Sequence, residues 1–199
     1  IPEEFANNFD LLYVKASLLV SCGDYENAKL IANQLKELDP ENTDVLMLLS
    51  VIAKATGSKA EKTAILKEIL AKNPRHSGAN TELGHEQMLK SNFKLANRYY
   101  LTALSGEANN LDALAGDGQS SYYLGNIKDA KSTFNKMLEI DETNAFAWAY
   151  LGKLEAETPD YSQALEYVEN AIKYEPDYYD YWLDYGTYLH NLNRNAEAE

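Results

Sequence analysis

Apolar and small residues recur along the chain with a period of 34 positions. Stepping by 34 through the sequence meets a small residue at every position of one series and at five of six positions of another. The first series is Ala16, Ser50, Gly84, Gly118, Gly152 and Gly186, and the second is Ala28, Lys62, Ala96, Ala130, Ala164 and Ala198. Small side chains are needed where two helices cross at short distance. The two series therefore predict repeated pairs of closely packed helices.

Large apolar residues accompany the small ones in the same steps. One column consists of Leu12, Leu46, Leu114, Trp148 and Trp182, with Asn80 as the exception. A second column stands three positions further on, a spacing typical of an amphipathic helix, and consists of Leu49, Leu83, Leu151 and Tyr185. Each unit is therefore expected to bury one face of each of its two helices.

Glycines and prolines separate the expected helices. Glycines stand in step in the middle of three units, at Gly23, Gly57 and Gly125. A glycine there supplies the positive φ with which many helices end. Prolines stand between units, at Pro40, Pro74 and Pro176, where they end one helix and turn the chain toward the next. In the fifth unit, we expect Thr158 to cap the second helix and Pro159 to open it.

This pattern resembles the tetratricopeptide repeat family, whose unit of about 34 residues opens with W-x₂-L-G-x₂-Y, continues with A-x₃-F and closes with proline. The fifth unit carries it most clearly, as Trp148, Leu151, Gly152, Ala164, Ala171 and Pro176. The resemblance implies an all-α fold, a right-handed α-solenoid of about five and a half 34-residue helix-turn-helix repeats. The expected segments are an N-terminal leader at 1–8, repeats at 9–42, 43–76, 77–110, 111–144 and 145–178, and a partial repeat at 179–199.

The sequence departs from the family pattern at a few positions. Lys62 replaces a small residue, Asp117 replaces the expected leucine, and Ala108 and Glu142 replace the closing proline. Because neighbouring units supply most of the stacking energy in a solenoid, these departures are expected to weaken local stability without changing the fold.

The sixth unit stops inside its second helix, at Ala198-Glu199. A stacked array needs a polar cap at its end, since the last unit otherwise exposes an apolar face. We expect that the full-length protein continues beyond residue 199. The alternative is that another copy of the chain covers this face.

Charge and tyrosine content are both concentrated in the second half of the chain. The net charge is −13, and residues 101–199 hold 18 acidic and 6 basic side chains, against 13 and 12 in residues 1–100. Eleven of the 15 tyrosines lie from Tyr122 onward. The acidity works against attachment to phosphate backbones or anionic lipid, so we expect no nucleic-acid partner. No run of about 18 apolar residues occurs, so direct membrane insertion is not expected either.

The sequence lacks the motifs that carry catalysis or bind metals and cofactors. His85-Glu86 begins like the zinc-protease motif H-E-x-x-H, but Leu89 stands where the second histidine would be. The nucleophile elbow, the phosphate loop and the calcium loop are all missing. We therefore expect no enzyme activity, no cofactor and no metal site. Cys22 is the only cysteine, and it is expected to be a small core residue.

The resemblance also implies where a ligand would bind. In this family the first helix of every unit lines a concave groove, which takes an extended peptide or a helix of a partner protein. Helical spacing places aromatic and acidic residues on that face in the fourth to sixth units. The candidate peptide-binding residues are Asp112, Gln119, Tyr122, Tyr123, Phe146, Tyr150, Lys153, Asp180 and Asp184. Tyrosines beside carboxylates favour a basic or proline-containing peptide. The alternative is that several of these aromatics simply pack between units.

The leading hypothesis is a non-catalytic protein–protein interaction scaffold within a larger protein. One alternative is a structural module that assembles with itself through the last repeat. Another is a domain that positions a subunit of a multi-protein complex, for example in the cell envelope. The abundance of Asn, Lys, Tyr and Ile favours a bacterial origin. The compartment stays open between the cytoplasm, the periplasm and attachment as a lipoprotein after removal of a signal.

Overall fold

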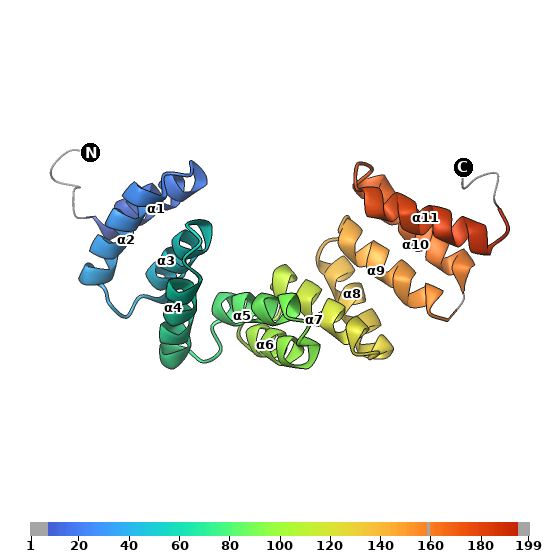
Figure 1. Cartoon of the computed structure of the whole chain (residues 1–199), viewed down its shortest axis with the longest axis horizontal. Coiled ribbons are helices and arrows are strands. Elements are labelled where there is room, and N and C mark those ends of the chain that lie inside the picture. Colours follow the sequence, from blue (N-terminus) through green and yellow to red (C-terminus); the bar gives the residue numbers. More distant parts are fainter. Residues whose placement is uncertain (1–7, 159, 195–199) are drawn as a thin grey trace. The chain divides into compact units, whose positions relative to one another are not determined.

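The structure is a computed structural model that describes residues 8–158 and 160–194, and these residues fold into α-helices joined by short turns (Figure 1). The helices are α1 (Phe9–Ser21), α2 (Tyr25–Leu38), α3 (Thr43–Ala55), α4 (Lys59–Lys72), α5 (Ser77–Leu89), α6 (Phe93–Gly106), α7 (Leu111–Tyr123), α8 (Ile127–Ile140), α9 (Ala145–Ala156), α10 (Tyr161–Tyr174) and α11 (Tyr179–Asn191). The expected all-α class is confirmed. Most of the predicted leader, Pro159 and the end of the partial sixth repeat, including Ala198, lie outside the described residues.

The helices alternate in position with the period of the sequence. The odd-numbered helices, which open the successive pairs, begin at Phe9, Thr43, Ser77, Leu111, Ala145 and Tyr179, at intervals of 34 residues. Each even-numbered helix follows after a turn of three or four residues and packs against its predecessor in the pairs α1–α2, α3–α4, α7–α8 and α9–α10. None of the described helices is long and apolar enough to cross a membrane.

A polar side chain caps the start of most of the pair-opening helices. The side-chain oxygens of Asn8, Asn42, Asn110 and Asn144 each accept a hydrogen bond from a backbone N–H two or three residues further on. In the third pair, His76 stands at the same step of 34, and its Nδ1 accepts from the Ala79 N–H at 3.2 Å. These bonds satisfy N–H groups that have no partner within the helix.

The turns inside the pairs use a left-handed residue at a fixed place. Gly23, Gly57 and Gly125 have φ of +79°, +77° and +74°, so the predicted role of these glycines is confirmed. Ser91 takes the same place in the third pair with φ of +56°. In the fifth pair, the cap of α10 is Asp160, whose side chain accepts from the Gln163 N–H, and not Thr158 as expected.

The chain divides into two compact units between Asn80 and Thr81, within α5. In the first unit, ion pairs join α2 and α4, the second helices of the first two pairs. Lys29 pairs with Glu61 at 2.7 Å and Lys36 with Glu68 at 3.0 Å.

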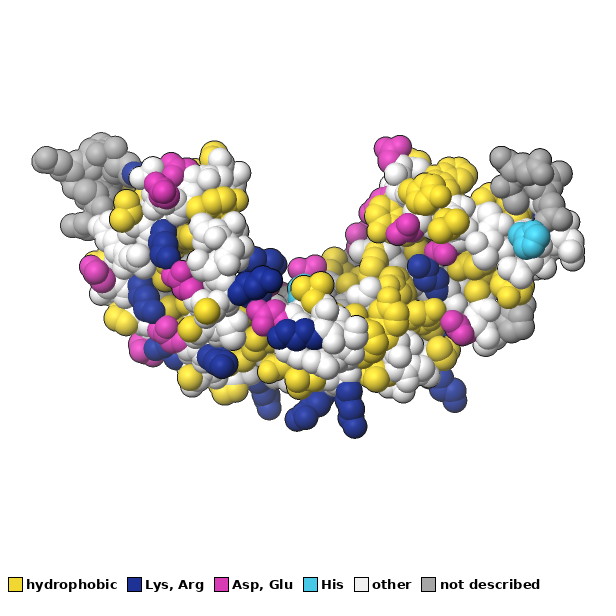
Figure 2. Space-filling model, in the orientation of Figure 1, with side chains coloured by type: hydrophobic (Ala, Val, Ile, Leu, Met, Phe, Trp, Pro, Cys, Tyr) yellow, Lys and Arg dark blue, Asp and Glu magenta, His cyan; other side chains and the backbone are white. Residues whose placement is uncertain are grey.

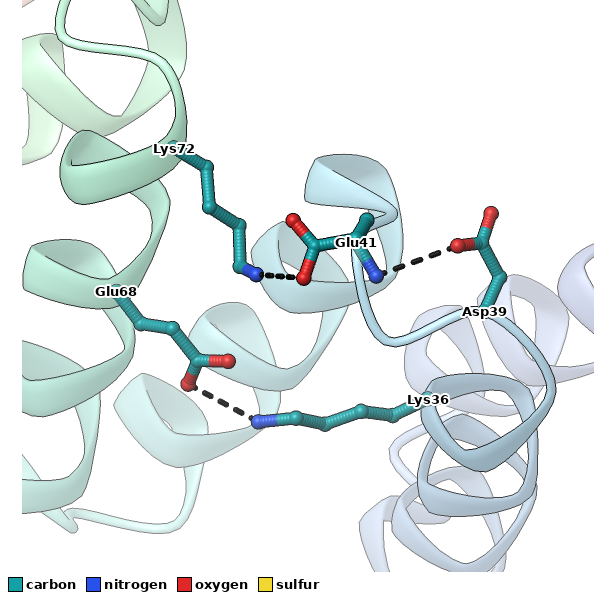
Figure 3. A network of polar contacts seen from close by, with 5 residues as sticks. All are labelled: Lys36, Asp39, Glu41, Glu68 and Lys72. Atoms are coloured by element: carbon teal, nitrogen blue, oxygen red, sulfur yellow. Dashed lines mark hydrogen bonds and ion pairs between the residues drawn. The ribbon is translucent and has the colours of Figure 1, made fainter.

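A further ion pair ties the turn after α2 to the end of α4. Lys72 pairs with Glu41 at 2.6 Å, and the Glu41 N–H donates to Asp39, as Figure 3 shows next to the Lys36–Glu68 pair. Exposed pairs of this kind contribute little individually, about 0.2–1 kcal/mol each. In the first unit these pairs place basic side chains next to acidic ones, so the charges there attract one another.

In the second unit, glycines allow a large ring to enter between two helices. Tyr100 of α6 is fully buried, with Gly84 of α5 on one side and Gly116 of α7 on the other. A Cβ atom at Gly84 would lie 2.6 Å from the ring, and one at Gly116 would lie 2.2 Å from it. At Gly118 a Cβ atom would meet Phe134 at 2.7 Å. Gly84 and Gly118, which belong to the first series of small residues, thus serve the close approach that the sequence predicted, and Gly116 does the same outside that series.

Asp117, which replaces the leucine of the repeat, forms a buried polar cluster between α6, α7 and α8. Its carboxylate accepts hydrogen bonds from Asn97 Nδ2 at 2.8 Å and from Thr133 Oγ1 at 2.9 Å. Asn97 also donates to the hydroxyls of Ser120 and Ser121 at 3.2 Å. Burial raises the pKa of Asp117, and the two donors oppose that shift. Side-chain donors therefore stand in for the apolar contacts that a leucine would make.

The expectation that Cys22 is a core residue is wrong. Cys22 is exposed, because it is the residue that ends α1 and lies beyond the part of the helix that packs against α2. Leu12 and Ala16 fill the buried positions of that helix instead.

Candidate functional site

The helices α7, α9 and α11 form a row in the second unit, which we call the first-helix row. α7 contacts α9 and α9 contacts α11, in addition to the contacts that each makes with α8 or α10. All nine candidate residues lie on these three helices. Equivalent positions of neighbouring helices in the row are therefore close enough to build one surface.

Aromatic rings form a continuous ladder across α6, α7 and α9. Phe93 stacks on Tyr123 with ring centroids 4.6 Å apart, and Tyr123 meets the edge of Tyr122 at 5.5 Å. Tyr122 meets Tyr150 edge-on at 5.8 Å, and Tyr150 contacts Phe146 at 4.6 Å. Stacked and edge-to-face pairs at these distances are favourable. These five residues are called the aromatic ladder below.

The rings of the ladder differ in how much surface they offer to a ligand. Tyr123 is 50% exposed, whereas Tyr150 is only 9% exposed and stacks on the buried Phe134 at 5.0 Å. Phe146 also contacts Phe134, at 6.1 Å. Tyr150 thus supports the surface from below and Tyr123 presents its ring to solvent, whereas Tyr122 and Phe146 are both half-buried. Figure 2 shows hydrophobic side chains, tyrosines included, gathered over α8 and α9 on the face that it draws.

Hydrogen bonds fix the orientation of the two central rings. Gln119 Nε2 donates to Tyr150 Oη at 2.6 Å, and Tyr122 Oη donates to Glu157 Oε1 at 3.1 Å. Burial, reinforced by the Glu157 carboxylate, raises the pKa of Tyr122 to about 12. Burial also raises the pKa of Tyr150. Tyr122 therefore keeps the proton that it donates to Glu157 well above neutral pH.

Charged side chains lie next to the ladder on α9 and α11. Lys153 Nζ lies 3.4 Å from Asp184 Oδ2 and 5.4 Å from the centroid of the Tyr150 ring. Burial raises the pKa of Asp184, the Lys153 ammonium lowers it, and the charge of Asp180 raises it further. Asp180 itself is exposed in the first turn of α11.

Asp112 is separate from the other candidate residues. It is exposed in the first turn of α7, about 15 Å along the helix from Tyr122. Its charge acts on Tyr100, whose pKa is raised mainly by burial and then by Asp112 and Glu82. A carboxylate in the first turn also stabilises a helix through the macrodipole, which gives Asp112 and Asp180 a structural reason to be acidic.

A pocket of about 520 Å³ opens beside the row, between α7, α9, α10 and α11. Its lining includes Tyr122, Lys153, Glu157, Tyr161, Asp184 and Tyr188. The candidate residues from the sequence did not include Tyr161 or Tyr188. Tyr161 begins α10, which is a second helix, and Tyr188 lies in the last turn of α11, so the high tyrosine content of this half was the only signal for them. Within the described residues, no group of three His, Cys, Asp or Glu side chains could hold a metal ion.

Two segments of the chain, residues 9–42 and 150–199, match family models described as "Tetratricopeptide repeat". The chain is 25% identical over 130 residues to Tetratricopeptide repeat protein 21B of Homo sapiens and 30% identical over 107 residues to Protein CTR9 homolog of Arabidopsis thaliana. These alignments cover 61% and 52% of the chain and 10% of each relative. The chain spans about a tenth of the length of the curated relatives that it matches.

Solved structures of low sequence identity share the fold. The pilF protein of Pseudomonas aeruginosa is 16% identical with a TM-score of 0.82, over 96% of this chain and 86% of that one. PilW, described as a type IV pilus biogenesis factor, is 16% identical with a TM-score of 0.77, over 96% and 88%. YrrB, described as a TPR protein with an unusual peptide-binding site, is 23% identical with a TM-score of 0.64, over 88% and 91%.

The repeated helix pairs, the family matches and the shared fold agree. Residues 9–42 and 150–199 are therefore tetratricopeptide repeats, and the described residues have an all-α helical-repeat solenoid fold. Repeats of this family indicate a scaffold for protein–protein interaction.

Proposed function

We propose that this chain is a non-catalytic scaffold that binds an extended, basic peptide segment of a partner protein along the first-helix row. The observation that carries the proposal is the aromatic ladder, which the chain's own hydrogen bonds hold in place next to carboxylates. Rings that are already ordered lose little side-chain entropy when a ligand covers them. YrrB, a protein of the same fold, is described as having an unusual peptide-binding site, which is consistent with this use of the fold.

The charges beside the ladder favour Lys or Arg in the ligand. Glu157 and Asp184 line one pocket together with a single basic side chain, Lys153, and the charge of Asp180 acts on Asp184 from the first turn of α11. The whole second unit reinforces this field, since residues 81–199 hold 20 acidic and 9 basic side chains. Charge complementarity of this kind contributes mainly to specificity and to the rate of association.

The experiment is selection of peptides from a random library against the chain, followed by titration of the selected peptides. The test variant is Tyr122→Ala/Glu157→Gln, which removes the most accessible hydrogen-bonded pair of the surface. Tyr150→Ala is a poor choice, because this ring stacks on Phe134 and its loss would leave a cavity. The matched control is Tyr25→Ala/Glu26→Gln on α2, which makes the same two substitutions in the other unit.

We expect peptides rich in Lys or Arg to be enriched and to bind the parent chain saturably. The test variant should lose at least about tenfold in affinity and the control variant should not change. Binding should weaken as salt increases, since exposed charges are screened. Failure to enrich any peptide, or equal binding by the test variant, would contradict the proposal.

Self-assembly is a second candidate function, favoured by apolar exposure on α11. Tyr179, Trp182 and Leu183 are 73%, 49% and 56% exposed on this helix. Sedimentation velocity over a range of protein concentrations tests it. If α11 mediates association, the parent chain should form oligomers as its concentration rises, and the Trp182→Gln variant should not. A parent chain that stays monomeric at high concentration rules out self-assembly.

A further inference from the structure

The pocket between α7, α9, α10 and α11 has three tyrosines in its wall. Tyr122 comes from α7, Tyr161 from α10 and Tyr188 from α11. The rings of Tyr161 and Tyr188 lie with centroids 6.3 Å apart and planes inclined at 37°. Aromatic faces attract cations, and a ring of several such faces recognises ammonium and guanidinium groups. We call this site the tyrosine pocket.

Negative charge is concentrated at the same place. Glu157 and Asp184 line the pocket, and the pKa of Tyr188 is raised first by burial and then by the charges of Asp184 and Glu157. The pocket also lies at the carboxyl ends of the row: Tyr122 is in the last turn of α7, Glu157 is the C-cap of α9, and Tyr188 is in the last turn of α11. The carboxyl end of a helix carries a partial negative charge, which adds to the attraction for cations.

The chain's own cation in this pocket, Lys153, makes only a long contact with the Asp184 carboxylate. Asp184 Oδ2 is buried, and its partner within the described residues is the Lys153 ammonium at 3.4 Å, which is long for an N–H···O bond. Lys153 Nζ also lies over the Tyr150 ring, 5.4 Å from its centroid. A buried carboxylate oxygen normally has a donor. The position of Lys153 thus indicates that the pocket accommodates a cation, and a cation placed closer to Asp184 would bind its carboxylate more strongly.

We propose that the tyrosine pocket anchors a single cationic side chain of the bound peptide, preferably arginine, and that this side chain displaces Lys153 from Asp184. The inference rests on the proposed function and identifies the anchor within it. A guanidinium is planar and has five N–H donors, so it can stack on a tyrosine ring while it donates to both Asp184 and Glu157. An ammonium provides the charge but not the planar fork.

The probe is the blocked pentapeptide Gly-Gly-Arg-Gly-Gly, compared with the same peptide that carries neutral citrulline in place of arginine. Both are titrated into the isotope-labelled chain and followed by NMR. We expect the arginine peptide to shift the signals of Tyr161, Asp184 and Tyr188 and to bind at least about tenfold more tightly than the citrulline peptide.

Substitution of Lys153 gives the sharper test, because it predicts a gain. Lys153→Met should tighten arginine binding by about two- to fivefold, since it removes a competing cation held by a partly exposed ion pair. Asp184→Asn should weaken the same binding. Lys131→Met is the matched control: Lys131 pairs with Glu155, outside the pocket, so this variant removes the same charge from the second unit and should leave affinity unchanged.

Equal binding of the arginine and citrulline peptides would overturn the inference, and so would a Lys153→Met variant that binds no more tightly than Lys131→Met. The proposed function is judged separately, by the peptides selected from the library. If these basic peptides bind to the row and neither Lys153→Met nor Asp184→Asn changes their affinity, the scaffold stands and the anchor is wrong. If they do not bind but the arginine pentapeptide does, the pocket stands and the scaffold proposal is wrong.

Discussion

At the scale of single residues, glycine is needed at some positions of the repeat for space and at others for backbone conformation. Gly116 and Gly84 leave room for the Tyr100 ring, and no larger residue could take their places without moving it. Ser91, in contrast, has a side chain at a left-handed turn position where other pairs have glycine. The same residue type is thus needed for two unrelated reasons, close approach and backbone conformation.

We predict that Gly116→Ala destabilises the second unit. The new Cβ atom would lie 2.2 Å from the Tyr100 ring, which is fully buried and held between two helices. Overpacking of a core costs about 1–3 kcal/mol. Urea denaturation followed by tryptophan fluorescence measures the loss, because both tryptophans, Trp148 and Trp182, lie in this unit. An unchanged midpoint would mean that the ring can move aside at no cost.

Ser91→Gly should have the opposite sign. A non-glycine residue in the left-handed region costs about 1–2 kcal/mol, and the greater freedom of glycine in the unfolded chain offsets about 0.5–1 kcal/mol of the gain. The net result is a stabilisation of up to about 1 kcal/mol, visible in the same denaturation experiment. Gly125→Ser, which puts a side chain at the matching turn of the next pair with φ of +74°, is the reverse control and should destabilise.

At the scale of helices, the sequence pattern predicted the helix pairs, but not the residues that cap the first helix of each pair. The steps of 34 among small residues located the helix pairs, because close crossings tolerate few residue types. The asparagines at 8, 42, 110 and 144 recur in the same step, and their capping role follows from the structure. His76 holds that place in the third pair, a role that its residue type alone does not indicate.

The cap at His76 should make stability depend on pH. Burial lowers the pKa of His76, so the unfolded chain takes up a proton first as the pH falls below about 6.5. The cap's contribution is therefore present above pH 6.5 and is lost as the pH falls through the lower pKa of the folded state. Protonation also removes the lone pair on Nδ1 that accepts the Ala79 N–H.

His76→Asn provides the measurement for this prediction. Asparagine caps the equivalent helices without titrating, so the variant should keep up to about 1 kcal/mol of stability that the parent loses between pH 7 and pH 5. Chemical denaturation at a series of pH values compares the two chains. Parallel pH profiles for parent and variant would show that His76 does not contribute in this way.

The candidate site was predicted less completely than the fold. Helical spacing placed Tyr122, Tyr123 and Tyr150 on one face, but it could not say that Tyr150 rests on Phe134 while Tyr123 is exposed, since that depends on the packing of α8. It also missed Tyr161 and Tyr188, because the tyrosine pocket is built by helices from three successive pairs. The prediction for Cys22 was wrong for a local reason: this residue follows the last residue of α1, beyond the buried Leu12 and Ala16.

At the scale of the whole molecule, charge is distributed unequally between the two compact units. Residues 1–80 hold 11 acidic and 9 basic side chains, and ion pairs such as Lys29–Glu61 join their helices. Residues 81–199 hold 20 acidic and 9 basic side chains. Excess charge of one sign destabilises a compact state through self-repulsion and attracts ligands of the opposite sign.

Salt should therefore act on the second unit in two opposite directions. Raising the salt concentration from about 20 mM to about 500 mM shortens the screening length severalfold, which relieves repulsion among the carboxylates and should raise the melting temperature reported by Trp148 and Trp182. The same change should weaken the binding of a basic peptide. The first unit, whose exposed ion pairs are attractive, should gain no stability. If salt lowered the melting temperature reported by the tryptophans, attraction rather than repulsion would dominate in the second unit, and the electrostatic basis for a basic ligand would be lost.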